Sequence, residues 1–514
     1  MNKDAEVDMK EVELNELDLE KQLMTGGGAG NSLLGTEKNG CVKVKVPEES
    51  DVKFTGLSKE ELMKVAGTPG WVRTRWILLV LFWLGWVGML AGAIVIIVQA
   101  PRCKPLPEMN WWNNGPLYQI WDVNAFVEMD GLKGLVEKID SLNQLKVKGL
   151  VVGPLHRVTQ DSLPTLNFME VNADIGSNEE LKNLLDKAHK KGISVVLDMT
   201  PNFQGQNLWF GKEEINEFVD KLKDAMSYWM SVGVDGFQFA GIDEVVKFAP
   251  SKWASLREIV QANRTEGTKK RVLIGVTKTI VAPEVSKLFN DSGVDLLLSE
   301  VLKPNDTATQ KGKIIEDLYL SQNQTSLAWS VGVSTKNHLA TLVSSKLVKL
   351  YQLLLFSLPG TPVFSYGDEI GLEKQNGTLS PKMLWGFSEG EEEKNETLKV
   401  EGERQRSYRS FFKTLSDLRG KERSLQHGDF QLLQNKTSSL AFLRQWDQSD
   451  RYLVALNWGA EPVSLSLSYE GLPAQATVVL STDPAKYPLE ATVDLQQLEL
   501  ELGQAVLLRF PYST

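Results

Sequence analysis

Two cysteine thiols, Cys41 and Cys103, are the most reactive side chains in this chain of 514 residues. The uncharged apolar stretch 76–98 separates them. At about 1.5 Å per residue, a helix over this stretch spans roughly 35 Å, which is enough to cross a bilayer. We therefore predict one transmembrane helix that acts as an uncleaved signal anchor. The membrane would then separate the two thiols, so they could not pair within one chain.

Cys103 lies just beyond the apolar stretch, in the segment "QAPRCKPLP". An unpaired cysteine in an oxidising compartment indicates a bond to another chain or a reactive thiol. The flanking prolines, Pro101, Pro105 and Pro107, favour an extended and accessible backbone. We predict an interchain disulfide at Cys103, with a free or palmitoylated juxtamembrane cysteine as the alternatives. Cys41 is predicted to be a free cytosolic thiol.

Acceptor sequences for N-glycosylation give the orientation of the helix, because all of them follow it and none precedes it. The arginines and lysines on its two sides are too evenly distributed to decide. We predict a single-pass type II protein of the plasma membrane with a cytoplasmic N-terminus and an extracellular C-terminal region. The acceptor asparagines are Asn263, Asn290, Asn305, Asn323, Asn376, Asn395 and Asn435.

The overall composition is acidic, with 56 Lys+Arg against 66 Asp+Glu and a net charge of −10. No basic stripe interrupts it, which argues against a nucleic-acid partner. The acidic N-terminus and the following "TGGGAG" predict a disordered cytoplasmic tail over residues 1–75. We predict no cofactor and no metal site.

The extracellular region begins with short apolar strands that alternate with amphipathic helices. After a neck over residues 99–110, this pattern predicts a (β/α)₈ barrel over residues 111–424. Strands alone follow, and they predict an antiparallel β domain over residues 425–514. The candidate barrel strands are 116–122, 148–154, 194–199, 236–239, 271–276, 295–300, 326–332 and 361–367. The candidate strands of the β domain are "SLAFLRQWD", "RYLVALNWG", "VSLSLSY", "ATVVLS" and "QAVLLRF".

Several stretches in this region resemble the α-amylase/α-glucosidase family, in that family's order. They are "PLYQIWDVNAF", "LKGLVEKIDSLNQLKVKGLVVGP", "AHKKGISVVLDMTPNF", "GVDGFQF" and "LPGTPVFSYGDEIGL". The resemblance implies the barrel fold. It also implies a carboxylate nucleophile after the fourth strand and a carboxylic acid after the fifth, which a retaining glycosidase needs roughly 5 Å apart.

The expected catalytic groups are missing from this sequence. The resemblance places the nucleophile at Ala240 and the general acid at Val276, and neither side chain carries a carboxylate. Gln238 stands where the family has an arginine. The family's third-strand motif survives as Asp198 and Asn202, without its histidine. Losing these groups together predicts that the chain is not an enzyme.

Other carboxylates follow the predicted strands and could in principle substitute. A displacement of even 1 Å is expensive in catalysis, and acids at strand ends usually anchor loops. The third family carboxylate is expected within residues 332–339, which contain no acid; the two alignments considered are Gly332-Val333-Ser334 and Asn337-His338-Leu339. The nearby acids are Asp243, Glu244, Glu300, Asp368 and Glu369.

The combination of one apolar span, an inactive α-glucosidase-like region and a lone juxtamembrane cysteine resembles the heavy chains of heteromeric amino-acid transporters. The short connection between Asn202 and "GVDGFQF" favours the branch that lacks an inserted subdomain. The resemblance implies a polytopic light chain as partner, a disulfide to it through Cys103, and delivery of that partner to the plasma membrane. It also implies association with integrin β subunits. The alternative is a stand-alone adhesion or signalling receptor.

Overall fold

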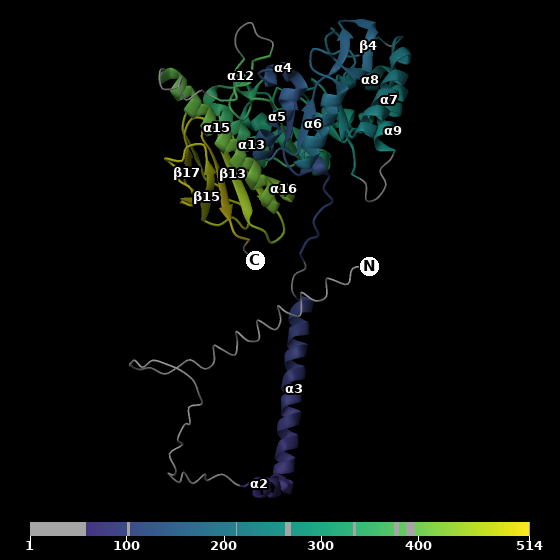
Figure 1. Cartoon of the computed structure of the whole chain (residues 1–514). Helices are drawn as coiled ribbons and strands as arrows, with labels where there is room; N and C mark the ends of the chain where they lie inside the picture. The colour runs from purple at the N-terminus through teal and green to yellow at the C-terminus, as the bar shows by residue number, and fades with distance from the viewer. Residues whose placement is uncertain are drawn as a thin grey trace, which may run out of the picture. The chain divides into compact units, whose positions relative to one another are not determined.

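The structure is a computed structural model that forms two compact units, Met1–Ala100 and Pro101–Thr514 (Figure 1). Of the predicted features, Cys41, most of the acidic tail, and the acceptors Asn263, Asn376 and Asn395 lie outside the described residues. The described residues are 58–99, 103–211, 213–262, 269–332, 336–374, 380–386 and 396–512.

Within its described residues, 58–99, the first unit contains two helices, α2 (Lys59–Ala66) and α3 (Pro69–Gln99). The prediction of a disordered tail is therefore wrong for residues 59–66 and 69–75, which are helical. Ser58 caps α2, because its hydroxyl accepts from the amide of Glu61 while the Glu61 carboxylate accepts from the amide of Ser58. Helix α3 contains the whole predicted span and reaches a mean hydropathy of 2.4 over its most apolar window. It is the one helix within the described ranges that is long and apolar enough to cross a membrane.

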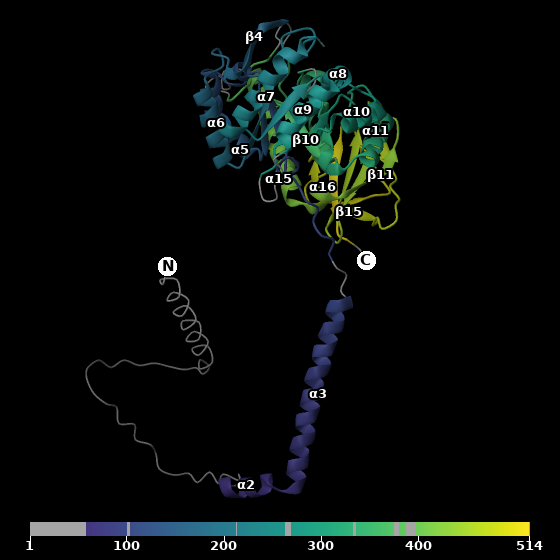
Figure 2. The same ribbon diagram turned by 90° about the vertical axis from the view of Figure 1, so that its right-hand side faces the viewer.

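The second unit is built on an eight-stranded parallel sheet in the order β8-β7-β6-β5-β2-β1-β10-β9 (Figures 1 and 2). A parallel bridge between Leu297 and Leu327 joins the two ends, so that the sheet closes into a barrel. All of the candidate barrel strands and the predicted (β/α)₈ fold are confirmed. The strands are β1 Leu117–Ile120, β2 Gly149–Val152, β5 Ser194–Asp198, β6 Gly236–Ala240, β7 Val272–Val276, β8 Leu296–Leu298, β9 Ala328–Trp329 and β10 Thr361–Ser365.

The helices around the barrel follow the apolar spacing of the sequence. In α6 (Asn178–Lys190), Leu181, Leu184, Leu185 and Ala188 are all buried, as one face of a helix with a 3.6-residue period requires. The other helices are η1 Trp111–Asn113, α4 Val123–Phe126, α5 Gly131–Gln144, α7 Ile215–Val232, α8 Ile242–Phe248, α9 Pro250–Gln261, α10 Ala282–Ser292, α11 Ala308–Ser321, η2 Gln324–Ser326, α12 Leu339–Leu342, η3 Ser345–Leu347, α13 Val348–Ser357, α15 Glu396–Lys421 and α16 Arg423–His427. Between β5 and β6 the chain holds one loop and α7, so the short connection carries no inserted subdomain.

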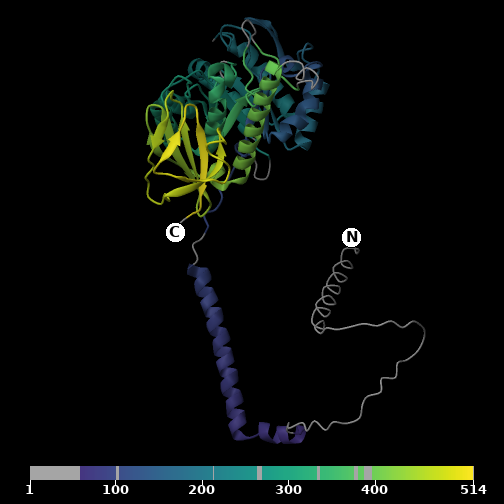
Figure 3. The same cartoon turned by 90° about the vertical axis from the view of Figure 1, so that its left-hand side faces the viewer.

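The C-terminal strands form the predicted antiparallel β domain, packed beside the barrel's helices (Figure 3). Its six-stranded sheet alternates sides: Leu440 and Phe442 join the barrel core, whereas Ala441 and Leu443 join a second core. The strands of this sheet are β11 Asp429–Asn435, β12 Ser439–Gln445, β13 Arg451–Asn457, β15 Gln475–Ser481, β16 Thr492–Asp494 and β18 Ala505–Phe510, and β14 (Val463–Leu465) pairs with β17 (Leu498–Leu500) in a separate two-stranded sheet. The sequence did not predict β11, β16 or β17, nor the hairpin of β3 (His156–Thr159) and β4 (Ser162–Val171) beside the barrel.

Two buried arginines connect the barrel to the elements that follow it. Arg419 of α15 donates to the carbonyls of Phe356 (2.5 Å) and Leu358 (2.9 Å). Arg444 of β12 donates to the carbonyls of Ser357 (2.6 Å) and Gly428 (2.8 Å). Burial lowers the pKa of Arg419 to about 10 and that of Arg444 to about 9. Both cations lie at the C-terminal end of α13, where the unpaired carbonyls of a helix favour positive charge.

Candidate functional site

The two positions where the family resemblance places the catalytic carboxylates lie side by side. Ala240 ends β6, Val276 ends β7, and the two residues are register partners across the parallel pair. The backbone around Ala240 is firmly held: its amide donates to the Thr200 hydroxyl at 2.9 Å, and its carbonyl accepts from Trp209 Nε1 at 2.9 Å. At the two positions that the family resemblance assigns to the carboxylates, the barrel therefore presents a methyl and an isopropyl group on a well-held backbone.

Asp198, at the end of β5, is occupied by structural hydrogen bonds. One carboxylate oxygen accepts from the amide and the hydroxyl of Thr200, at 2.9 and 2.6 Å. The other oxygen accepts from Gln238 Nε2 at 3.0 Å. Burial raises the pKa of this carboxyl, although these hydrogen bonds act in the opposite direction. Asp198 and Gln238 thus connect β5 to β6, and neither carboxylate oxygen is left without a partner.

Asn202 is likewise held by hydrogen bonds, to its own loop and to the turn between β3 and β4. Its Nδ2 donates to Asp161 Oδ1 and to the carbonyl of Asn207, both at 2.7 Å. Its Oδ1 accepts from the amide of Asp161 at 3.2 Å. Asn202 therefore connects the loop between β5 and α7 to the turn between β3 and β4.

Asp243 and Glu244, at the start of α8, are the acids nearest to the missing nucleophile. Asp243 accepts from the Thr277 hydroxyl at 2.9 Å. Partial burial, and then the neighbouring Asp243, raise the pKa of Glu244. Both line a cavity of about 70 Å³ together with Ala240 and Val276. Ligand sites typically enclose about 300–1,000 Å³, so this cavity is too small for a sugar.

A larger cavity of about 320 Å³ adjoins the smaller one through Leu208, Ala240 and Lys278. Its charged groups are the hydrogen-bonded Asp198 and two lysines, Lys278 and Lys336. The Nζ of Lys336 lies 5.9 Å from the centre of the Phe203 ring. Glycoside hydrolysis needs two carboxyl groups, a general acid and a nucleophile, and this lining supplies only Asp198, whose oxygens are already hydrogen-bonded. The lining residues are Pro154, Asp198, Thr200, Phe203, Leu208, Ala240, Lys278 and Lys336.

The acids after β10 are buried and anchor the surrounding loops. Asp368 accepts from the amides of Leu339 (2.7 Å) and Ser365 (2.8 Å), and burial raises its pKa to about 8. Glu369 accepts from the Tyr118 hydroxyl at 3.0 Å, and burial raises its pKa as well. These contacts confirm that both acids are loop anchors. After β8, the amide of Glu300 donates to the carbonyl of Thr279 at 3.2 Å.

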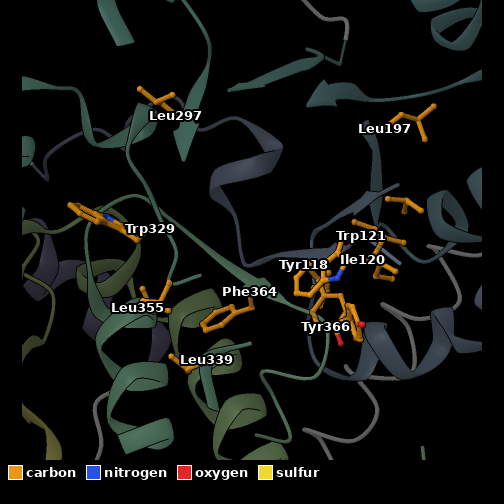
Figure 4. Close-up of a cluster of buried hydrophobic side chains, with 14 of the residues drawn as sticks. Tyr118, Ile120, Trp121, Leu197, Leu297, Trp329, Leu339, Leu355, Phe364 and Tyr366 are labelled. Carbon is orange, nitrogen blue, oxygen red and sulfur yellow. The ribbon is translucent and has the colours of Figure 1, made fainter. Parts of the chain in front are cut away.

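His338, which belongs to one of the two alignments considered for the family's third acidic motif, packs within the core. Its ring lies 5.0 Å from that of Trp121 and 4.8 Å from that of Tyr366, measured between centroids. Figure 4 shows Trp121 and Tyr366 beside each other at this end of the barrel. Burial lowers the pKa of His338 to about 4, so the ring is neutral at physiological pH.

The predicted attachment sites lie on other parts of the second unit. Cys103 is exposed, in the extended segment before η1. Among the glycan acceptors within the described ranges, Asn290, Asn305 and Asn323 are exposed, whereas Asn435 is half-buried. Asn435 Nδ2 donates to the carbonyl of Thr309 at 3.2 Å.

Comparison with known proteins decides between the enzyme and the transporter resemblance. Residues 42–118 match the family model of the solute carrier family 3 member 2 N-terminus, and residues 122–217 match that of the α-amylase catalytic domain. The amino acid transporter heavy chain SLC3A2 of Oryctolagus cuniculus is 44% identical, over 100% of both chains. This chain belongs to the SLC3A2, or 4F2 heavy chain, family. The human heavy chain SLC3A1 is 23% identical over 95% of this chain and 90% of its own length.

Solved structures place the second unit of this SLC3A2 family member among the α-amylase folds. The α-amylase of Geobacillus thermoleovorans, in complex with acarbose, superposes with a TM-score of 0.60 at 18% identity. The match covers 79% of this chain and 100% of the amylase. The likeness shows the fold alone.

Sequence reasoning missed several residues at this end of the SLC3A2 barrel. Lys278 and Lys336 line the larger cavity, but neither belongs to a family motif. Trp209 and Thr200, which fix the backbone of Ala240, come from the loops after β5. Their contacts with Ala240 could not be predicted from the sequence, because isolated tryptophans and threonines are common in any loop.

Proposed function

We propose that this chain is the ancillary heavy chain of a heteromeric amino-acid exchanger. It binds a polytopic light chain, by a disulfide and by non-covalent contacts, and brings that partner to the plasma membrane. The full-length similarity to the SLC3A2 amino acid transporter heavy chains carries this proposal. Helix α3 supports assigning transport to the light chain, because a single helix whose stretch 76–98 is apolar throughout offers no path for a polar solute.

The proposed topology is type II. Exposed acceptors at Asn290, Asn305 and Asn323 support a luminal and then extracellular second unit, because N-glycans are added on that side. The N-terminal tail would then be cytoplasmic.

The proposed covalent link runs through Cys103. It is the one cysteine that follows α3, and its side chain is exposed, so a partner thiol can reach it. Cys103 and the partner's cysteine each lose a proton, and their two electrons reduce the disulfide of an oxidised thiol–disulfide oxidoreductase.

We further propose that the barrel has no glycosidase activity. Ala240 and Val276 occupy the catalytic positions, and Asp198 has hydrogen bonds to both of its oxygens. In this proposal the barrel is a folded extracellular platform, and association with integrin β subunits rests on the family resemblance alone.

A gel comparison of wild type and Cys103→Ser tests the covalent link. Membranes from cells that co-express the chain with an epitope-tagged light chain are run with and without reductant. We expect a heavy band that contains both proteins, collapses on reduction and is absent from Cys103→Ser. A monomer-sized band in every lane would contradict the link and would favour the stand-alone receptor.

A further inference from the structure

The residue that follows Cys103 is fastened to the β domain at several points. The backbone amide of Lys104 donates to Asp447 Oδ2 at 3.0 Å. Its ammonium lies 3.8 Å from Asp429 Oδ2 and 4.7 Å from the centre of the Trp446 ring. We call these three contacts the Lys104 anchor. They hold both the backbone and the side chain of Lys104 against the turn between β12 and β13.

The receiving turn is itself well fixed. Trp446 is only 5% exposed, and its amide donates to the Ser424 hydroxyl at 3.1 Å, which ties the turn to α16. Asp447 has a φ of 42°, a left-handed conformation that aspartate tolerates better than most residues. The Lys104 anchor therefore joins the neck to a rigid part of the fold.

A disulfide makes strict geometric demands, because its two Cα atoms usually lie about 4.4–6.8 Å apart. A cysteine on a freely moving neck would satisfy this distance rarely. Fixing Lys104 reduces the volume that the Cys103 sulfur samples. This raises the effective concentration of the Cys103 thiol at the partner's cysteine.

We propose that the Lys104 anchor positions Cys103 for the interchain disulfide, so that the partner's cysteine docks beside the β12–β13 turn. This inference rests on the proposed function. Lys104, Asp429 and Asp447 are positioning residues in it, because they act through Cys103. The anchor makes linkage fast, and non-covalent association does not depend on it.

The test follows the rate of linkage in cells that co-express the full-length chain with a light chain. After pulse labelling, non-reducing gels measure how fast the disulfide-linked band forms in wild type, Lys104→Ala and Asp447→Gly. Glycine accepts the left-handed conformation at residue 447 while removing the carboxylate. Lys104→Arg keeps the cation and its contact with the Trp446 ring.

Control variants change exposed charged side chains elsewhere, in Lys413→Ala and Glu470→Gln. We expect linkage to slow several-fold in Lys104→Ala and Asp447→Gly. Lys104→Arg and both controls should link at the wild-type rate. The rate at which a small maleimide modifies Cys103 should be unchanged in Lys104→Ala, since the anchor affects position and leaves the accessibility of the thiol unaltered.

The outcomes separate the inference from the proposed function. If wild type forms no linked band, the covalent part of the proposed function fails. If wild type links, but Lys104→Ala and Asp447→Gly both link at the same rate, the anchor has no positioning role and this inference is overturned; Lys104→Ala alone keeps the backbone amide bond to Asp447. If Asp447→Gly unfolds, Lys104→Pro decides instead, because it removes the amide hydrogen and the side chain together. The Lys104 side chain is 53% exposed, so its removal leaves no buried cavity.

Discussion

Ala240 and Val276 are register partners at the ends of β6 and β7, so the two positions where the family resemblance places a glycosidase's carboxylates are immediate neighbours. Their strands are intact, and Thr200 and Trp209 hold the backbone of Ala240. The strand ends at which the family resemblance places the site are therefore intact, and neither Ala240 nor Val276 carries a carboxylate.

Restoring the two carboxylates should not restore hydrolysis. In the double variant Ala240→Asp with Val276→Glu, Asp198 still has hydrogen bonds from Thr200 and Gln238. Gln238 still stands where the family has an arginine, and the third family carboxylate is still missing. Each missing catalytic group typically costs several kcal/mol of transition-state stabilisation. We expect no release of nitrophenol from a nitrophenyl α-glucoside above the wild-type background. Turnover by the double variant would show that the surrounding site is still competent.

Removing the buried Arg444 should destabilise the second unit. Arg444→Ala leaves the carbonyls of Ser357 and Gly428 without this donor and opens a cavity, at a cost of about 3 kcal/mol. Arg444→Lys should recover little of it, because one ammonium cannot reproduce the planar fork of donors. Urea unfolding of the purified protein measures the change. Arg423→Ala, at an exposed position of α16, is the matched control, and an equal effect of both alanine variants would contradict the role of Arg444.

Acidification should weaken the fold through His338. Its pKa is about 4 in the folded chain against 6.5 as the ordinary value, so the unfolded state binds more protons between these values. The free energy of unfolding should therefore fall as the pH drops from about 6.5 through 4, by on the order of 3 kcal/mol from this group.

His338→Phe keeps a ring against Trp121 and Tyr366 and removes the titrating group. Two other buried groups have shifted pKa values: that of His156 is lowered to about 4, and that of Asp368 is raised. Both groups titrate in the variant and in wild type, so the difference between the two proteins isolates the contribution of His338. Thermal unfolding at pH 7, 5.5 and 4.5 should show a flatter pH dependence in the variant. Parallel curves would contradict the assignment.

Glycan occupancy should differ between two of the acceptor sites. Asn323 is exposed. The Nδ2 of Asn435 instead donates to the carbonyl of Thr309 and is packed closely against Gly312, where an added Cβ would lie only 3.0 Å from it. We expect Asn323→Gln to increase gel mobility by one glycan and Asn435→Gln to leave it unchanged. Enzymatic deglycosylation should make all bands coincide. A mobility shift in Asn435→Gln would show that a glycan displaces this contact.

The sequence predicted the elements whose burial leaves a periodic or continuous apolar signal. The apolar runs of β2 and β7, and the helical spacing of Leu181, Leu184 and Leu185 in α6, are examples. The β3–β4 hairpin was missed because buried and exposed positions do not alternate regularly along β4, and because Pro164 interrupts that strand.

The sequence predicted only those site positions that lie within recognisable family motifs. The replacements at Ala240 and Val276 follow from the family resemblance, and the structure shows where those residues lie. Contacts between distant segments could not be predicted in this way. The bond from Lys104 to Asp447 joins residues 343 positions apart, and no local pattern marks either partner.

The most direct measurement of the central claim is the surface level and activity of a light chain with and without this chain. A tagged light chain is expressed in cells that lack heavy chains, and surface biotinylation is combined with uptake of a labelled amino acid. We predict that surface labelling and uptake rise together only when this chain is co-expressed. A light chain that reaches the surface and exchanges amino acids equally well without it would contradict the account.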